Sequence, residues 1–303
     1  MLRSTSVKQE SWKPVKLLAK QPVKDKILAL ECDLEGKIAV VLTTNSINIF
    51  NERELLKVVN IEGGSQLHVS SFLENIYVLN SEKLYCFDYW GNQKWEYLSE
   101  GLIDDFVVAP SGINVVLRGE KFLTFLNRFG DVEWDHNFSE STINMHYTKR
   151  GDFLVSTTNS IFSQTENNTF NKIMDISDQM STFFSDEGGV AVTANHIISF
   201  SITGHTLWQN ESSNIKHIKY SNNSLKNYFI SNDKNLICQD RNGDELWSYS
   251  SEDELGGFDV LNSGSMIGQY SNTYFHIIDE NGEQAWSYYA REKIVDFSHL
   301  GGV

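Results

Sequence analysis

A short motif recurs five times in the 303-residue chain, and its spacing limits the fold to a repeat architecture. Glycine is the fourth residue of every copy and tryptophan is the eighth, and the copies are Asp88–Trp95, Asn127–Trp134, Ser201–Trp208, Asp240–Trp247 and Asp279–Trp286. Successive tryptophans are 134−95 = 39, 208−134 = 74, 247−208 = 39 and 286−247 = 39 residues apart. Fixed self-similarity at a period of about 40 residues is typical of propellers and related repeat proteins.

Two further copies are degenerate. The interval of 74 residues is close to twice 37, and near its middle lies Gln164–Asn171, with Phe170 close to the position at which tryptophan is expected. Upstream, 95−39 = 56 identifies Leu56 in the segment Asn51–Leu56, which has neither the glycine nor the tryptophan. The chain is therefore predicted to contain seven repeats.

The motif has a physical interpretation as a β-hairpin. Apolar and aromatic segments such as Phe122–Leu126 and Tyr274–Ile278 precede it and are typical of strands. Its first residue is often Asp or Asn, which can bond the backbone of a turn, and glycine accepts a positive φ at the corner. The tryptophan then falls on the returning strand, where it can pack against a neighbouring repeat. Structural roles are accordingly predicted for Gly91, Trp95, Gly130, Trp134, Gly204, Trp208, Gly243, Trp247, Gly282 and Trp286.

The remainder of each repeat also has the character of strands. Ile103–Val108 and Ile113–Leu117, for example, are separated by the turn residues Ser111 and Gly112. Four strands in about 39 residues match one propeller blade, and no segment shows a sustained helical period. We expect an all-β propeller of four-stranded blades over residues 27–303, with seven full repeats and the start of an eighth.

The eighth repeat is predicted from the end of the chain. Ile294–Val303 resembles the opening of an earlier repeat, Thr182–Val190, with matching Phe-Ser and Gly-Gly-Val segments. Two explanations remain open: the segment Lys13–Ala19 supplies an outer strand that closes the ring, or the chain is a fragment of an eight-bladed protein. The second is favoured slightly, because one N-terminal strand would not replace the two or three that are missing.

The form Asp-x-Asn-Gly-x-x-x-Trp, in Asp240–Trp247 and Asp279–Trp286, resembles the repeat of the PQQ-like (quinoprotein-like) β-propeller family. The resemblance implies the fold and is weakly informative about function, because the family includes quinone-dependent dehydrogenases, assembly lipoproteins and non-enzymatic scaffolds. WD40 propellers are the nearest alternative, but their Gly-His and Trp-Asp dipeptides do not recur here at fixed positions.

Charge is distributed unevenly along the chain. The net charge is −15, yet residues 1–26 carry seven basic and two acidic residues, a net +5, and the remainder carries 18 against 38, a net −20. This acidity argues against nucleic-acid binding and favours basic protein partners. The basic N-terminal tail is expected either to lie on the acidic body or to act as an arm for an anionic partner.

The sequence indicates a cytoplasmic protein. It has no apolar N-terminal segment of the length that a secretory signal needs, and no apolar run long enough to span a membrane. Cys32, Cys86 and Cys238 are odd in number and far apart, which is typical of free thiols in a reducing compartment.

Few residues suggest catalysis or metal binding. Asp104, Asp105 and Asp296 precede expected inner strands and would lie at the mouth of the central channel, where carboxylates can act as acids or bases or bind a cation. Solvated loop charge is the simpler interpretation. The turns Asp240–Asp244 and Asp279–Glu283 partly resemble calcium loops but lack the bidentate glutamate, and the eight histidines show no metal-binding spacing.

We therefore predict a non-catalytic propeller scaffold that mediates protein–protein interaction, without cofactor, metal or catalytic residues. The resemblance would imply quinone chemistry only with adjacent cysteines and a calcium site, and no adjacent cysteines occur. The alternative is a ligand-binding propeller or quinoprotein-type enzyme with its site in the central channel. Polar groups converging on one pocket would favour this alternative, whereas an exposed aromatic or acidic face would favour the scaffold.

Overall fold

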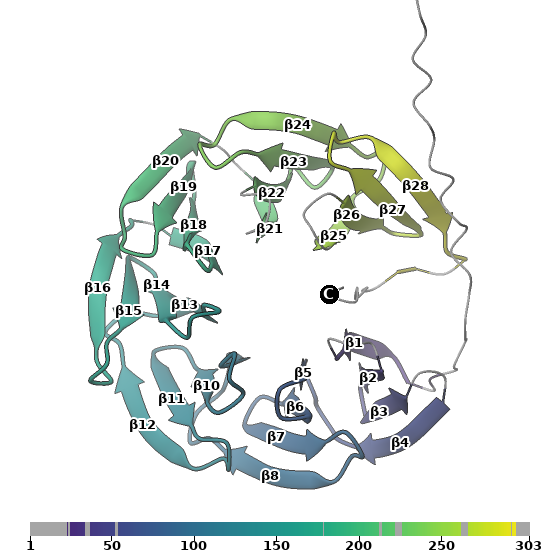
Figure 1. Cartoon of the computed structure of the whole chain (residues 1–303), viewed down its shortest axis with the longest axis vertical. Helices are drawn as coiled ribbons and strands as arrows, with labels where there is room; N and C mark the ends of the chain where they lie inside the picture. Colours follow the sequence, from purple (N-terminus) through teal and green to yellow (C-terminus); the bar gives the residue numbers. More distant parts are fainter. Residues whose placement is uncertain are drawn as a thin grey trace, which may run out of the picture.

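The computed structural model describes Val23 and residues 25–33, 37–51, 54–177, 179–211, 214–221, 226–261, 266–291 and 293–294. These residues form seven four-stranded antiparallel sheets arranged as blades around a ring, and no helix occurs among them (Figure 1). The predicted all-β propeller with seven full repeats is therefore confirmed. Of the segment predicted to begin an eighth repeat only Ile294 is described, and the proposed closing strand Lys13–Ala19 also lies outside the described residues.

Each blade consists of four consecutive strands, so the chain completes one blade before it enters the next. The strands, blade by blade, are β1 (Ile27–Cys32), β2 (Ile38–Thr43), β3 (Ser46–Asn51) and β4 (Glu54–Asn60); β5 (Gln66–Ser70), β6 (Asn75–Leu79), β7 (Lys83–Asp88) and β8 (Gln93–Leu98); β9 (Asp105–Val108), β10 (Val115–Arg118), β11 (Phe122–Leu126) and β12 (Val132–Asn137); β13 (Thr142–Tyr147), β14 (Phe153–Thr157), β15 (Ser160–Gln164) and β16 (Phe170–Asp175); β17 (Gln179–Ser185), β18 (Gly188–Thr193), β19 (His196–Ser201) and β20 (Thr206–Glu211); β21 (Ile215–Ser221), β22 (Lys226–Ser231), β23 (Asn235–Gln239) and β24 (Glu245–Ser250); β25 (Leu255–Leu261), β26 (Met266–Ser271), β27 (Tyr274–Asp279) and β28 (Gln284–Tyr289).

The first strand of every blade lies nearest the centre of the ring and the fourth lies at the rim (Figure 1). Because each blade has an even number of antiparallel strands, the chain enters every blade from the same face of the ring. The turns between first and second strands and those between third and fourth strands consequently share one face, which we call the hairpin face. The connections between blades lie on the opposite face.

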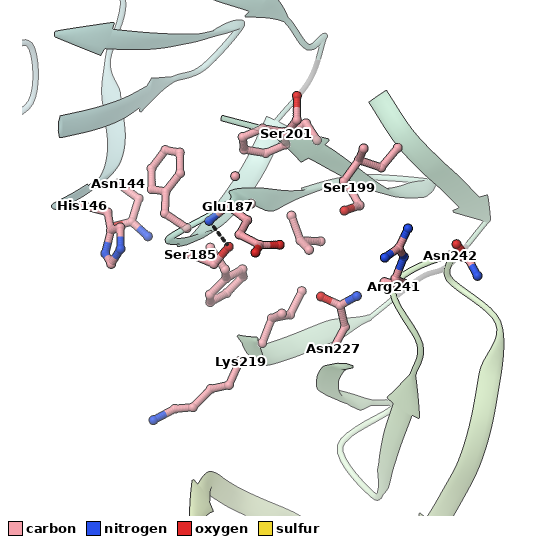
Figure 2. A pocket seen from close by; sticks show the side chains of 18 of the residues that line it. Asn144, His146, Ser185, Glu187, Ser199, Ser201, Lys219, Asn227, Arg241 and Asn242 are labelled. Atoms are coloured by element: carbon pink, nitrogen blue, oxygen red, sulfur yellow. Dashed lines mark hydrogen bonds between the residues drawn. The ribbon is translucent and has the colours of Figure 1, made fainter. Parts of the chain in front are cut away.

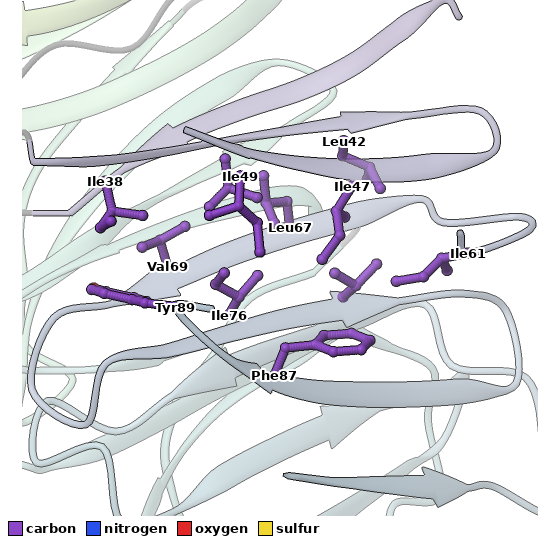
Figure 3. Close-up of a cluster of buried hydrophobic side chains, with 12 residues drawn as sticks. Ile38, Leu42, Ile47, Ile49, Ile61, Leu67, Val69, Ile76, Phe87 and Tyr89 are labelled. Atoms are coloured by element: carbon purple, nitrogen blue, oxygen red, sulfur yellow. The ribbon is translucent and has the colours of Figure 1, made fainter. Parts of the chain in front are cut away.

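Burial follows the position of each strand within its blade. The second strands are buried on both sides, as in β6 and β14, because each blade packs face to face against two neighbours. The outer strands alternate between half-buried and exposed residues, as in β24. Between blades 1 and 2 an apolar cluster fills the seam, contributed by Ile38, Leu42, Ile47 and Ile49 from one blade and Leu67, Val69, Ile76 and Phe87 from the other (Figure 3).

Local chemistry explains the recurring hairpins. In the turn that follows β27, Asp279 Oδ1 accepts hydrogen bonds of 2.9 Å from the amides of Asn281 and Glu283. Gly282 has a φ of +82°, and its amide donates to the Asp279 carbonyl at 3.1 Å. The aspartate thus closes the turn while glycine supplies a backbone conformation that residues with a Cβ rarely adopt.

Candidate functional site

The motif tryptophans all lie on outer strands, namely β8, β12, β20, β24 and β28. Three of them lie under the hairpin glycine of the following blade: Trp95 under Gly130, Trp208 under Gly243 and Trp247 under Gly282. All five motif glycines have φ between +77° and +86°. In these three pairs the tryptophan of one blade contacts the hairpin of the next.

Two positions assigned to degenerate repeats are wrong. In blade 1, Lys57 takes the place that a motif tryptophan has in the pairing of the third and fourth strands, and it contacts the next hairpin glycine, Gly91. The spacing of the repeats had predicted Leu56 for this place. The distance from Lys57 to Trp95 is 95−57 = 38 residues, one fewer than the regular repeat, which explains the error.

In blade 4 the hairpin glycine Gly204 of the next blade packs against Ile173. Phe170 does not take the tryptophan position; its ring lies 5.9 Å from that of Trp134, on the side of the preceding blade. The glycine of the blade 4 hairpin is replaced by Asn168, which has a φ of +55°. Asparagine tolerates this region better than most residues, so the turn is kept although the motif is lost.

The predicted acidic cluster is held by an arginine that the sequence analysis did not identify. Asp105 begins the inner strand β9 and Asp104 precedes it, and the Arg118 guanidinium lies 3.6 Å from Asp104 Oδ2 and 3.9 Å from Asp105 Oδ2. Arg118 also donates to the carbonyl of Thr142 in blade 4, and Gln66 in blade 2 donates to that of Asp104. Burial raises the pKa of Asp105, although Arg118 opposes the shift.

Both carboxylates lie beside Arg118 of their own blade, which argues against a free acid–base pair. Asp296, the third predicted residue of the channel mouth, lies outside the described residues.

A cavity of about 500 Å³ borders the central channel between the inner strands of blades 1 to 4. In its wall Glu31 Oε2 accepts a 2.7 Å hydrogen bond from the Val69 amide and lies 3.4 Å from His68 Nδ1. Burial lowers the pKa of His146, whose Nε2 has no hydrogen-bond partner among the described atoms. Glu31 is thus used to hold blade 1 against blade 2.

A larger cavity, of about 680 Å³, extends from the inner strands β13 and β17 to the seam between blades 5 and 6 (Figure 2). Its apolar wall includes Phe183, Phe184 and Phe200, and its polar groups include Asn227 and Arg241. None of these residues was predicted from the sequence. Alignment of the repeats could have revealed Asn227, because it occupies a position that is apolar in several other blades.

Apolar side chains are exposed on the hairpin face of blades 2 and 3. Phe72, Trp90 and Phe129 are 67%, 64% and 61% exposed, and Ile113 is 49% exposed. They lie in the turns β5–β6, β7–β8, β11–β12 and β9–β10 respectively. We call these four residues the aromatic face.

Contacts between the turns hold these residues in one region. Phe72 packs beside Gly112 in the loop that also carries Ile113. The Tyr89 hydroxyl, next to Trp90, donates to the Ser70 carbonyl at 3.3 Å and fixes that turn against the end of β5. The blade 3 hairpin is tied to blade 2 because the Trp95 indole donates to the Arg128 carbonyl at 2.9 Å.

The described residues do not fit the quinone or metal chemistry of the catalytic PQQ-like proteins. Cys32, Cys86 and Cys238 are free thiols in three different blades, and two of them are fully buried. Among the described residues no three His, Cys, Asp or Glu side chains gather in a way that would hold a metal ion.

No helix in this part of the chain has the length and apolarity to cross a membrane.

Comparison with known proteins gives evidence about the fold. No protein-family model matches the chain, and no curated protein matches it. Among solved structures it is similar to Hsv2 of Kluyveromyces marxianus, with a TM-score of 0.68, 9% identity and coverage of 88% of this chain and 99% of that one. It is also similar to Kluyveromyces lactis Hsv2 (TM-score 0.65, 10% identity, covering 90% and 100%). BamB from Moraxella catarrhalis gives a TM-score of 0.61 at 13% identity, covering 85% and 84%. At these identities the similarity shows that the chain shares a propeller fold with these proteins.

Proposed function

We propose that this chain is a non-catalytic scaffold of the PQQ-like type, which binds a protein partner through its aromatic face. The observation that supports this proposal is the exposure of Phe72, Trp90 and Phe129 on neighbouring turns of one face. Large aromatic side chains dominate the energy of protein–protein contacts, because they bury much area at little cost in conformational entropy. Rigid strands hold the turns that carry them, so little order would have to be gained on binding.

The chemistry of the partner follows from charge. Residues 27–303 carry 18 basic and 38 acidic residues, and the exposed Glu74 adjoins the aromatic face. A partner segment with apolar side chains flanked by lysine or arginine would complement this surface. Binding should therefore weaken as salt concentration rises.

The proposal is tested by affinity capture from the native source, with the captured proteins identified by mass spectrometry. The informative variant is F72S/W90S/F129S, and the matched control is L102S/M180S. Leu102 and Met180 are similarly exposed, at 65% and 68%, but Leu102 lies in the connection between blades 2 and 3 and Met180 near the start of β17, both towards the opposite face. A partner that is bound by the wild type and the control, and is lost with the triple variant, would support the proposal. Retention of the same partners by the triple variant would contradict it.

We also infer a cytoplasmic location, on the basis of the three free cysteines. Cell fractionation with an antibody against the chain tests this inference, and recovery in a secreted or membrane fraction would exclude it.

A further inference from the structure

One position in the seam between blades 5 and 6 departs from the pattern of several other blades. In blade 2, Tyr77 pairs with Cys86, which pairs with the motif residue Trp95, and the residue before Tyr77 is Ile76. Blade 6 repeats this arrangement as Tyr228, Cys238 and Trp247. The residue before Tyr228 is Asn227.

Asn227 is as buried as its apolar counterparts. The same strand pairing identifies the equivalent residues of other blades, which include Ile76 in blade 2, Val115 in blade 3 and Ile267 in blade 7. Each of these side chains packs against the preceding blade. They are at most 1% exposed, and Asn227 is 2% exposed. A polar side chain therefore replaces part of the apolar core at this seam.

The amide of Asn227 is only partly satisfied. Its Nδ2 donates to the Asp240 carbonyl at 3.4 Å, and Oδ1 has no hydrogen-bond partner among the described atoms. Gln239, which pairs with Asn227 across the sheet, takes the place of Phe87 in blade 2, and its Oε1 also has no described partner. Buried acceptors without donors are unfavourable, and Asn227 lines the cavity, so a ligand that donates a hydrogen bond there would satisfy its Oδ1.

The cavity has the size and the walls of a small-molecule site. Its volume of about 680 Å³ lies within the roughly 300–1,000 Å³ that is common for such sites. Phe183 and Ile218 contribute apolar walls at the seam between blades 5 and 6, and Asn227 on β22 also lines the cavity. Figure 2 shows the Asn227 amide bordering the same space as Glu187 and Arg241.

Two opposite charges stand at this cavity. Arg241, in the turn between β23 and β24, has no carboxylate within ion-pair distance among the described residues, whereas the nearby Lys219 is paired with Asp259 at 2.7 Å. Glu187, in the turn between β17 and β18, is exposed, and its carboxylate has no cationic partner in the described part of the chain. A ligand with one negative and one positive group would satisfy both residues.

We propose that this cavity binds a small aromatic zwitterion whose ring system carries a hydrogen-bond donor. The donor would bond to Asn227 Oδ1, the carboxylate would pair with Arg241, and the ammonium group would pair with Glu187. The ring would pack against Phe183 and Ile218, which belong to one apolar cluster at the seam between blades 5 and 6. This small-molecule site is separate from the aromatic face and does not depend on the scaffold function.

L-tryptophan is the probe, because it contains all of these groups. Its binding to the intact chain is measured by calorimetry at millimolar ligand. Three analogues each lack one group: 1-methyltryptophan lacks the N–H donor, tryptamine lacks the carboxylate and indole-3-propionate lacks the ammonium group. Each analogue is expected to bind about tenfold more weakly than tryptophan.

Two variants locate the site. N227I introduces the residue found at the equivalent positions 76 and 267, and it should reduce tryptophan affinity more than tenfold. R241Q should weaken tryptophan binding about tenfold and leave tryptamine binding unchanged. R128Q is the matched control, because Arg128 has the same turn position in blade 3, and it should bind tryptophan as the wild type does.

Thermal unfolding distinguishes a binding role from a structural role for Asn227. N227I should unfold at the wild-type temperature or above it, because it replaces a buried unpartnered amide with a side chain that two other blades accommodate. A clearly lower unfolding temperature would show that Asn227 supports the fold, and would overturn the proposal. The same conclusion follows if tryptophan fails to bind at millimolar concentration, or if it binds N227I and R241Q as tightly as the wild type.

Discussion

The indole of Trp247 lies against Gly282 in the hairpin of the next blade, and its Nε1 donates a 2.9 Å hydrogen bond to the Glu280 carbonyl of that hairpin. The same relationship joins Trp95 to Gly130 and the Arg128 carbonyl. One motif residue thus closes a turn and another supports the turn of the following blade. The repeat therefore encodes contacts within a blade and contacts between blades.

Gly282→Ala should destabilise the protein by about 2–3 kcal/mol. The alanine would be held at a strained, positive φ, and its Cβ would lie 2.7 Å from Trp247 Cδ2. Gly63→Ala is the matched control, since Gly63 has a φ of +71° but no atom near the position of its Cβ. The control should lose about 1 kcal/mol, from backbone strain alone. Equal losses in urea unfolding would show that the contact with Trp247 contributes nothing.

Trp247→Ala should lower the free energy of unfolding by about 3 kcal/mol, the lower end for removal of a large aromatic side chain, because the indole is half-buried. The centre of its ring lies 6.1 Å from that of Tyr228 in the same blade. Trp90→Ala, at a side chain that is 64% exposed, should change stability by less than about 0.5 kcal/mol. If Trp247→Ala lowered the free energy of unfolding by less than about 1 kcal/mol, the indole would contribute little to packing and would act at the surface instead.

Asp105→Asn should change the pH dependence of stability. Burial raises the folded-state pKa of Asp105 above its ordinary value of 3.8, with Arg118 opposing the shift. This carboxyl therefore stabilises the folded state below its unfolded pKa and loses that contribution as pH rises through the folded pKa. The unfolding free energy of the variant, relative to wild type, should rise between about pH 3 and pH 7 in urea titrations.

Asp240→Asn is the control, because its effect on stability should change with pH in the opposite direction. Burial alone would raise the pKa of Asp240, but hydrogen bonds from the amides of Asp244 and Asn242 bring it below its ordinary value. Its stabilising contribution is present above the unfolded pKa and is lost as pH falls, so the variant should become relatively less stable as pH rises. The same slope for both variants would show that their environments do not differ as described.

Alkylation with iodoacetamide at about pH 8 should distinguish the three cysteines. Burial raises the pKa of Cys86 to about 12 and that of Cys238 to about 11, and both thiols are inaccessible. Cys32 is half-buried and should react first, although burial also raises its pKa. Mass spectrometry should find Cys86 and Cys238 modified only after denaturation, and rapid modification of either in the folded protein would contradict the packing of its blade.

The sequence by itself determined the number of blades and the position of most hairpins. Glycine at a positive φ and aspartate or asparagine at the start of a turn act over a few residues, so they can be recognised without knowledge of the rest of the fold. The count failed at Leu56 because one repeat is a residue shorter, and at Phe170 because the blade 4 turn uses Asn168. Local motifs do not record such changes of spacing.

Only the tertiary structure decided which distant side chains meet. Asp104 and Asp105 were recognisable as charged residues before a strand, but their pairing with Arg118 depends on the register of β9 with β10. Alignment of the repeats could mark Asn227 as a polar residue at a position that is apolar in other blades, but only strand pairing showed that it is buried where Ile76 and Ile267 are buried. The physical reason is that burial and pairing in a propeller arise between blades, whereas the sequence pattern of one strand reports mainly on its own turns and its own two faces.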